Sequence, residues 1–388
     1  MIKAARPDRR RAVVVAALGT AQTLAWASSY YLPAILAKPI AQGLGLPRAQ
    51  VFAAFTVALL ITAFAGPFVG RMIDRRGGRG VLVLSNVLLA GGLIGLAAAQ
   101  GVVSLYASWA VLGVGMAMGL YDAGFAALTA LYREEARGAI TGITLIAGFA
   151  STVSWPVSSY LNDMIGWRET CLVWAVLNLV VALPLNFLLP SVVRPAGTGA
   201  RSEPRVGWQP RKEMALVAFA FAAGWFVTGS MAAHLPGLLE RAGASEVAAI
   251  AAASLVGPAQ VAARILELLV LRQVHPLISA RIAASLHPIG AALFAVTAPA
   301  GAALFVVLYA AGNGLLTIAR GTVPLALFGP RGYGERTGLI GAPARAAQAF
   351  APLLFGLLLD ATGLGALVLS VGLCLAALAA LCALRPLR

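Results

Sequence analysis

The sequence predicts an all-α membrane protein with twelve transmembrane helices arranged in two pseudo-symmetric six-helix bundles. Three observations support this prediction. Hydrophobic residues make up 60% of the 388 positions and charged residues 11%, against roughly 45 to 50% and 25% in soluble domains. Apolar runs of about 20 residues, the length that spans a bilayer, recur along the chain. One long polar stretch, residues 191–212, divides these runs into two sets of six.

The predicted helices occupy residues 12–37, 49–72, 79–99, 102–132, 138–162, 166–190, 213–239, 246–271, 279–298, 300–328, 337–360 and 363–384. The first run follows five basic residues, as in a signal peptide, but it is longer than the apolar core of such a peptide. We therefore interpret it as a retained first helix. The predicted domains are an N-terminal bundle at 1–190, a cytoplasmic linker at 191–212 that is rich in proline and arginine, and a C-terminal bundle at 213–388.

The basic residues predict the orientation of the chain. Of the 29 lysines and arginines, 22 fall in the N-terminal tail, the even-numbered loops and the C-terminal tail. Because these residues collect on the cytoplasmic side, we expect a multi-pass protein of the cytoplasmic (inner) membrane with both termini in the cytoplasm. The same asymmetry explains the net charge of +15 without a nucleic-acid partner. Cys171, Cys374 and Cys382 lack the spacing of metal ligands, so neither a disulfide framework nor a zinc site is expected.

An internal repeat relates the two halves. A shift of 196 residues aligns "ALYREEARGAITG" at 130–142 with "ALFGPRGYGERTG" at 326–338 without a gap, and Pro156 then falls on Pro352. Both segments join the fourth to the fifth helix of their half. Repeated six-helix halves are a known plan of membrane transporters.

A charged stretch, "GRMIDRRGGR" at 70–79, lies between the second and third predicted helices. With the two six-helix halves, it resembles the signature loop of the major facilitator superfamily, G-x-x-x-D-R-x-G-R-R. The residues that match this signature are Gly70, Asp74, Arg75, Gly77 and Arg79. The resemblance implies that they form a conformational gate. Gly78 stands where the signature has a basic residue.

The resemblance implies a latch in this loop. Asp74 would accept hydrogen bonds from the start of the eleventh helix, near Thr337, an arrangement that the helix dipole favours. We expect the arginines of the loop to pair with Glu134 and Glu135. The alternative is a solvated basic loop that only sets topology.

Charged residues also interrupt the apolar helices: Asp122, Arg264, Glu267, Arg320 and Arg345. A charge that faces lipid at mid-bilayer costs about 2.5 to 3.5 kcal/mol, so we expect these side chains to face the interior or lie near the cytoplasmic helix ends. Polar residues recur at helical spacing on several helices and form a seam. The candidate substrate-binding residues on it are Arg264, Arg345, Gln260, Asn313, Gln22, Trp26, Tyr30 and Trp155.

The segment "QVAAR", Gln260 to Arg264, resembles the D-x-x-x-R segment of the monocarboxylate porter branch of that superfamily, in which the arginine receives the substrate carboxylate. Arg264 matches, while Gln260 replaces the aspartate and puts proton coupling at that position in question. An arginine fork suits a carboxylate, so Arg264 is the first candidate and Arg345 the second. The alternative is structural pairing, with Glu267 against Arg264 and Asp122 against Arg320 or Arg345.

The candidate proton-coupling residues are Asp122, Glu267 and His234, although His234 is equally consistent with a structural histidine near a helix end. Together these features predict a secondary active transporter that moves a small organic anion by alternating access. Coupling to protons is left open. We expect no cofactor, a small solute, protons and lipid as partners, and a monomer.

Two other functions remain open. The first is an efflux permease for drugs or for a toxic inorganic solute such as a metalloid, for which Cys171 is the nearest thiol to a helix entrance. The second is a membrane enzyme or receptor. Against an enzyme, His234, His275 and His287 lie in separate segments without a nucleophile or metal spacing, and the chain has no phosphate-binding loop.

Overall fold

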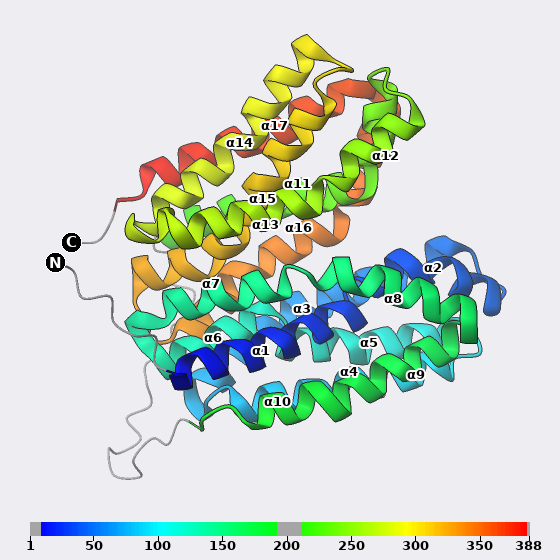
Figure 1. Ribbon diagram of the computed structural model, residues 1–388, viewed down its shortest axis with the longest axis vertical. Coiled ribbons are helices and arrows are strands. Elements are labelled where there is room, and N and C mark those ends of the chain that lie inside the picture. Colours follow the sequence, from blue (N-terminus) through cyan, green and yellow to red (C-terminus); the bar gives the residue numbers. More distant parts are fainter. Residues whose placement is uncertain (1–8, 192–211, 386–388) are drawn as a thin grey trace. The chain divides into compact units, whose positions relative to one another are not determined.

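The computed structural model describes residues 9–191 and 212–385, and the regular elements in these ranges are all helices (Figure 1). This confirms the predicted all-α class. The predicted linker at 191–212 lies almost entirely outside the described residues.

The chain divides into two compact units. The first contains Met1–Ala58 and Met72–Arg194, and the second contains Leu59–Arg71 and Pro195–Arg388. The middle of one helix, Leu59–Arg71, therefore groups with the second unit. The domain boundaries at 190 and 213 stay a prediction.

Ten α-helices start between residues 9 and 183. They are α1 (Arg9–Ser28), α2 (Leu32–Gly43), α3 (Arg48–Arg76), α4 (Arg79–Ala97), α5 (Val102–Gly119), α6 (Tyr121–Tyr132), α7 (Ala136–Ala147), α8 (Ala150–Ile165), α9 (Trp167–Leu177) and α10 (Leu183–Phe187). A 3-10 turn, Arg133–Glu135, precedes α7, and a π-helical turn, Asn178–Ala182, joins α9 to α10.

Seven further α-helices follow residue 211. They are α11 (Lys212–Arg241), α12 (Glu246–Ser254), α13 (Val256–Leu269), α14 (Pro276–Thr297), α15 (Ala302–Phe328), α16 (Tyr333–Thr362) and α17 (Ala366–Ala383). Short 3-10 turns, Leu271–Gln273 and Gly363–Gly365, precede α14 and α17.

Several predicted helices are interrupted in the structure. The predicted helix 12–37 is α1 and α2, 102–132 is α5 and α6, 138–162 is α7 and α8, and 246–271 is α12 and α13. In the described part of the chain, ten helices or helix runs are long and apolar enough to cross a membrane. Two of these runs, Val102–Ile165 and Tyr333–Ala383, each hold two of the predicted helices.

Helix pairing inside each unit follows the same order. In the first unit α1 packs on α7, and α4 packs on α5 and α9. In the second unit α11 packs on α16, and α14 packs on α15 and α17. Figure 1 shows α4, α9 and α10 side by side in the first unit and α14 beside α15 in the second. Equivalent predicted helices thus meet in both units, as the internal repeat requires.

A buried network of amides joins the helices of the first unit. Asn178 donates through Nδ2 to the hydroxyl of Ser28 and to the carbonyl of Trp174, both at 2.9 Å. Asn86 donates to Oδ1 of Asn178 at 3.3 Å, and Asn186 donates to Oδ1 of Asn86 at 2.8 Å. Because unpaired polar groups are costly in the bilayer core, this network favours one arrangement of α1, α4, α9 and α10.

Arginines at the helix ends cap helix C-termini. The last carbonyl groups of a helix lack intrahelical partners and carry the negative end of the helix dipole. Arg168 donates to carbonyls at the end of α4, Arg241 to the end of α16, Arg281 to the end of α17 and Arg336 to the end of α15. Part of the large positive charge therefore serves to terminate helices.

Candidate functional site

Arg264 is a buried arginine with unused donors. It lies in the middle of α13, and 5% of its surface is exposed. Its Nη2 donates to Oε1 of Gln260, one turn earlier, at 3.3 Å. Within the described residues Nε and Nη1 have no hydrogen-bond partner. Because a buried cation is costly unless it is paired, this guanidinium is suited to receive an anion.

A close contact between α13 and α15 fixes the position of Gln260. A Cβ atom added to Gly314 of α15 would lie 2.6 Å from the carbonyl oxygen of Gln260 and 3.0 Å from its Cα. Only a glycine allows this approach. The absence of a side chain at Gly314 thus helps to place the Gln260–Arg264 turn inside the second unit.

Glu267 follows Arg264 by three residues on α13. The Glu267 carboxylate is 1% exposed and accepts a hydrogen bond from the hydroxyl of Ser279 on α14 at 2.7 Å. This contact directs the carboxylate toward α14, and the salt bridge between Glu267 and Arg264 stays a prediction.

The other candidates of the second unit lie on α15 and α16. Arg320 is 4% exposed, and its guanidinium stacks over the ring of Trp225 on α11, with 4.9 Å between the guanidinium carbon and the ring centroid. This is a cation–π contact. Arg345, 3% exposed, shares a face of α16 with Gln348, as predicted from their spacing. Trp225 is not among the residues predicted from the sequence. Its position on one helix face with Thr228 is the signal that could have identified it.

Asn313 lies at a small cavity inside the second unit. Its Oδ1 accepts a hydrogen bond from the hydroxyl of Thr228 at 3.0 Å. The cavity has a volume of about 30 Å³ and is also lined by His287 and Cys374. Asn313 therefore lies at a cavity inside its own bundle.

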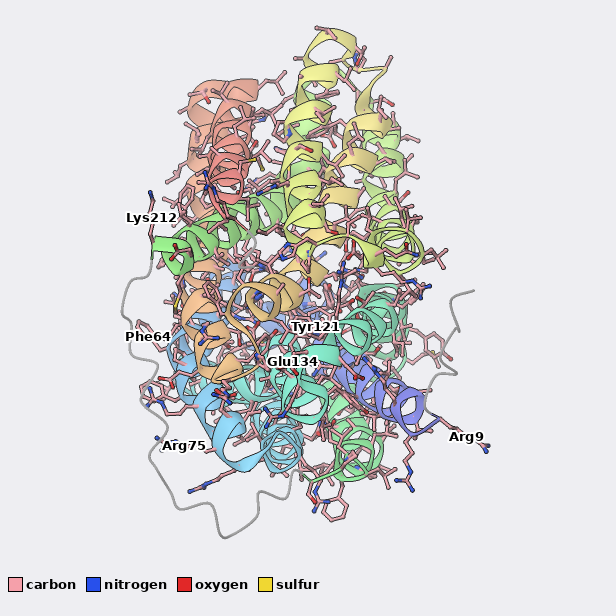
Figure 2. The ribbon with its side chains drawn as sticks, turned by 90° about the vertical axis from the view of Figure 1, so that its left-hand side faces the viewer. Arg9, Phe64, Arg75, Tyr121, Glu134 and Lys212 are labelled. Carbon is pink, nitrogen blue, oxygen red and sulfur yellow. The ribbon has the colours of Figure 1, made fainter. Side chains whose placement is uncertain are left out.

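The first unit contributes an aromatic cluster. The ring of Trp26, 3% exposed, lies 5.1 Å from that of Tyr30, 5.9 Å from that of Tyr31 and 4.9 Å from that of Tyr121. Trp155 lies at the margin, 6.2 Å from Tyr31, and is 45% exposed. Trp26 and Tyr30 thus come together as predicted, whereas Trp155 is largely outside the cluster. Figure 2 marks Tyr121 at the start of α6.

Gln22 and Asp122 lie near the break between α5 and α6. Gln22 is 1% exposed and donates through Nε2 to the carbonyl of Gly119, the last residue of α5, at 2.6 Å. Asp122 is half-buried in the first turn of α6. Both predicted residues therefore lie at the same interruption of the fourth predicted helix.

His234 makes a structural contact. Its Nε2 donates to the carbonyl of Pro352 on α16 at 2.7 Å, and its ring lies 5.9 Å from that of Phe355. A Cβ atom added to Gly356 would lie 3.0 Å from the imidazole. This packing agrees with the structural alternative for His234 that the sequence left open.

The gate motif, residues 70–79, is mostly helical. The α3 helix continues to Arg76 and ends with Gly77, whose φ of 79° is disfavoured for other residues, and α4 begins at Arg79. Arg75 is exposed (Figure 2). The Arg79 guanidinium lies 5.0 Å from the ring centroid of Phe187. Asp74 is half-buried.

The predicted pairing of the motif arginines with the loop after α6 is wrong for Glu135. Glu135 instead pairs with Arg11 of α1 at 3.5 Å, and Arg11 also donates to the Glu135 carbonyl. Arg11 belongs to the N-terminal basic cluster, so this cluster makes a specific contact in addition to its expected role in topology.

Inside the second unit, the α3 segment Leu59–Arg71 packs closely on α16. A Cβ atom added to Gly70 would overlap the backbone of Gly334, and Arg71 pairs with Glu335 at 2.5 Å. Gly70 of the motif is therefore a close-packing residue. The adjacent Arg71–Glu335 ion pair was not predicted, because Arg71 matches no position of the signature.

Cys171 and Cys374 are buried and Cys382 is exposed, and all three are free. In the ranges that the structure covers, no three His, Cys, Asp or Glu side chains form a metal-binding group.

The comparisons with known proteins identify the family. The model of the Major Facilitator Superfamily matches residues 18–342. An uncharacterized 38 kDa protein in the 23S RNA operon of Thermoproteus tenax is 33% identical over 156 residues, which is 40% of each chain. The purine ribonucleoside efflux pump NepI of Salmonella paratyphi B is 28% identical over 165 residues, 42% of this chain and 41% of the pump. The match thus spans about two fifths of the length of these curated relatives.

Solved structures share the fold over nearly the whole chain. The human organic anion transporter MFSD10 (TETRAN) has a TM-score of 0.72 at 17% identity, covering 97% of this chain and 100% of that one. The proton:xylose symporter XylE has a TM-score of 0.74 at 13% identity, covering 95% of each chain. The E. coli fucose:proton symporter FucP has a TM-score of 0.71 at 14% identity, covering 96% of this chain and 98% of that one.

These neighbours have the twelve-helix fold and are transporters rather than enzymes. Because the family model covers most of the chain and the helices have the length and apolar character of membrane spans, this multi-pass integral membrane protein belongs to the Major Facilitator Superfamily, a family of secondary transporters.

Proposed function

We propose that this protein is a secondary active transporter that moves a small organic anion, of the monocarboxylate type, across the cytoplasmic membrane by alternating access. The observation that carries the proposal is the guanidinium of Arg264, which is 5% exposed and has two nitrogens without a hydrogen-bond partner in the described structure. A planar guanidinium matches the two oxygens of a carboxylate.

The neighbours of Arg264 favour an external anion over an internal one. Gln260 presents a neutral oxygen to the guanidinium of Arg264 at 3.3 Å. An aspartate at this position would present a competing negative charge. Glu267 is directed to the hydroxyl of Ser279 at 2.7 Å. Two donor nitrogens of Arg264 are thus left for a solute in the described structure. Arg345, 3% exposed on α16, is the second proposed anchor.

Transport by reconstituted protein tests this proposal. Wild-type vesicles should take up radiolabelled short monocarboxylates, and Arg264→Gln should lower the initial rate at least tenfold, about 1.4 kcal/mol of lost stabilisation. Arg264→Lys should retain part of the rate, since it keeps the charge but not the fork. Arg272→Gln is the matched control, because Arg272 is exposed in the turn after α13. Equal rates for Arg264→Gln and the wild type would disprove the assignment.

A proton step, if one accompanies the anion, is best assigned to Glu267. Its carboxylate is buried and one turn from Arg264, whereas His234 is held by the Pro352 carbonyl. Glu267→Gln preserves an acceptor for Ser279 but cannot titrate. It should abolish uptake driven by a pH gradient and preserve anion exchange at equal pH on both sides.

We also propose that the gate motif controls conformational exchange. Gly70 packs on the backbone of Gly334, and the motif ends α3 at Gly77. Asp74→Asn should slow turnover of the reconstituted protein and leave solute affinity in detergent unchanged. A loss of affinity with normal turnover of bound solute would place the solute at this motif instead.

A second candidate function is efflux of a flat, drug-like solute. The NepI relative is a purine ribonucleoside efflux pump, and the Trp26 cluster offers aromatic rings for stacking. The metalloid variant has less support, since Cys171 is fully buried. Resistance profiles of cells that lack the gene would distinguish efflux from uptake. The cytoplasmic placement of both termini belongs to the same proposal and rests on the distribution of basic residues.

A further inference from the structure

The fourth predicted membrane helix is discontinuous. The α5 helix ends at Gly119, Leu120 is extended with φ −87° and ψ −173°, and α6 begins at Tyr121. The surrounding run is apolar and long enough to span the membrane. Irregular backbone at membrane depth is tolerated where it is buried in protein or lines a polar cavity. Such breaks hold ions in transporters, because the carbonyl end of a half-helix attracts cations.

Gln22 of α1 lies against this break. Its Nε2 donates to the Gly119 carbonyl at 2.6 Å, which fixes the orientation of the carboxamide. On the other side, a Cβ atom added to Gly124 of α6 would lie 3.1 Å from the same Nε2 and 3.4 Å from the carboxamide carbon. The amide group is therefore held between the end of α5 and the first turns of α6.

The oxygen of this amide is the unexplained group. Gln22 is 1% exposed, and its Oε1 has no hydrogen-bond partner in the described residues. A buried acceptor of this kind is normally satisfied by a protein donor, an ordered water or an ion. The oxygen is fixed in place by the Nε2 bond to Gly119, so it is a preorganised ligand.

The local charge favours a cation. Residues 102–132 contain one charged side chain, Asp122, in the first turn of α6, and no lysine or arginine. The rings of Trp26, one turn after Gln22 on α1, and of Tyr121, next to Asp122, lie 4.9 Å apart. Calcium and magnesium take several carboxylates or waters, and transition metals prefer nitrogen and sulfur ligands. One carboxylate with neutral oxygens matches the charge of a monovalent ion.

We propose that the α5–α6 break binds Na⁺ through Oε1 of Gln22 and carbonyl oxygens at the end of α5, with the carboxylate of Asp122 balancing the charge. Binding itself is independent of the solute. Entry of the ion into the transport cycle, where one Na⁺ would neutralise one monocarboxylate, rests on the proposed function. Asp122 then acts as part of a sodium site and not as the proton carrier predicted from the sequence.

Thermal unfolding of the purified full-length protein tests this site. NaCl is titrated against choline chloride at constant ionic strength, with KCl in parallel. The expected result is a saturable rise in Tm with Na⁺, because a ligand that binds only the folded state stabilises it. Gln22→Leu and Asp122→Asn should raise the half-saturating Na⁺ concentration at least tenfold. Gln50→Leu is the matched control, because Oε1 of Gln50 already accepts a bond from Tyr106 at 2.9 Å.

Asp122→Asn covers the case in which Gln22→Leu fails to fold, because it leaves the Gln22 bond to the Gly119 carbonyl in place. The proposal is overturned if Na⁺ and choline act alike on the wild type, if K⁺ alone gives the shift, or if Asp122→Asn leaves half-saturation unchanged. A sodium response without carboxylate uptake would refute only the anion proposal, and uptake without a sodium response would refute only this one.

Discussion

The two units bury different kinds of polar group. The buried polar side chains of the first unit are amides and hydroxyls, with Asn86, Asn178 and Asn186 at their centre. All five charged residues that are buried in the described structure belong to the second unit: Arg264, Glu267, Arg320, Glu335 and Arg345. The two units pair equivalent helices in the same way, but they bury different kinds of polar side chain.

This difference separates two tasks. The amide network of the first unit satisfies its own donors, as in the chain from Asn186 through Asn86 to Asn178, and so it stabilises the helix arrangement. The second unit buries an arginine, Arg264, whose donors are only partly used. A costly buried charge is retained where it serves a ligand. Stability should therefore be most sensitive in the first unit, and solute selectivity in the second.

The largest expected effect on stability is at the centre of the amide network. Asn178→Ala removes the donors to Ser28 and Trp174 and leaves the amide of Asn86 without its acceptor. Lost hydrogen bonds and a buried unpaired group should together cost about 3 kcal/mol. The measurement is thermal unfolding in detergent. Asn162→Ala is the control, because in the described residues the Asn162 side chain donates to its exposed neighbour Asp163, and its cost should be below about 0.5 kcal/mol. Similar Tm changes for both variants would contradict a stabilising role for the network.

A smaller effect is expected at a helix end of the second unit. Arg281 donates to the carbonyls of Leu381 at 3.2 Å and Leu384 at 2.9 Å, which closes the C-terminus of α17. Arg281→Gln should cost about 1 to 2 kcal/mol and increase local fraying. The exposed thiol of Cys382 reports on that end through its rate of maleimide labelling.

Two controls define this experiment. Arg272→Gln removes an exposed arginine and should leave the Cys382 labelling rate unchanged. The buried thiols of Cys171 and Cys374 should stay unlabelled while the protein is folded. If Arg281→Gln labels at the wild-type rate, the arginine does not restrain the end of α17.

The sequence was sufficient for the fold class and the family. The lengths of the apolar runs and the residues of the gate motif depend on local pattern, and both agree with the helices and the family match. The breaks at Leu120 and Leu255 were not predicted. Both lie in continuous apolar sequence, where packing against other helices decides the backbone.

The candidate site was only partly predictable for a similar reason. Helical spacing correctly placed Arg345 and Gln348 on one face and Gln260 beside Arg264. It could not show that Glu267 turns to Ser279, that Arg320 stacks on Trp225, or that Glu135 pairs with Arg11. Each of these contacts joins two different elements of the fold, so the partner is set by tertiary packing.

The smallest expected effect tests whether every titratable residue of the second unit serves transport. His234 donates to the Pro352 carbonyl at 2.7 Å and packs on Phe355, so its role should be structural. His234→Gln keeps a donor and should cost no more than about 1 kcal/mol of stability, while the pH profile of uptake stays that of the wild type. Glu267→Gln serves as the comparison and should flatten that profile. If His234→Gln also flattens it, the histidine titrates during transport, and the charges that matter in this unit extend from α13 to the contact between α11 and α16.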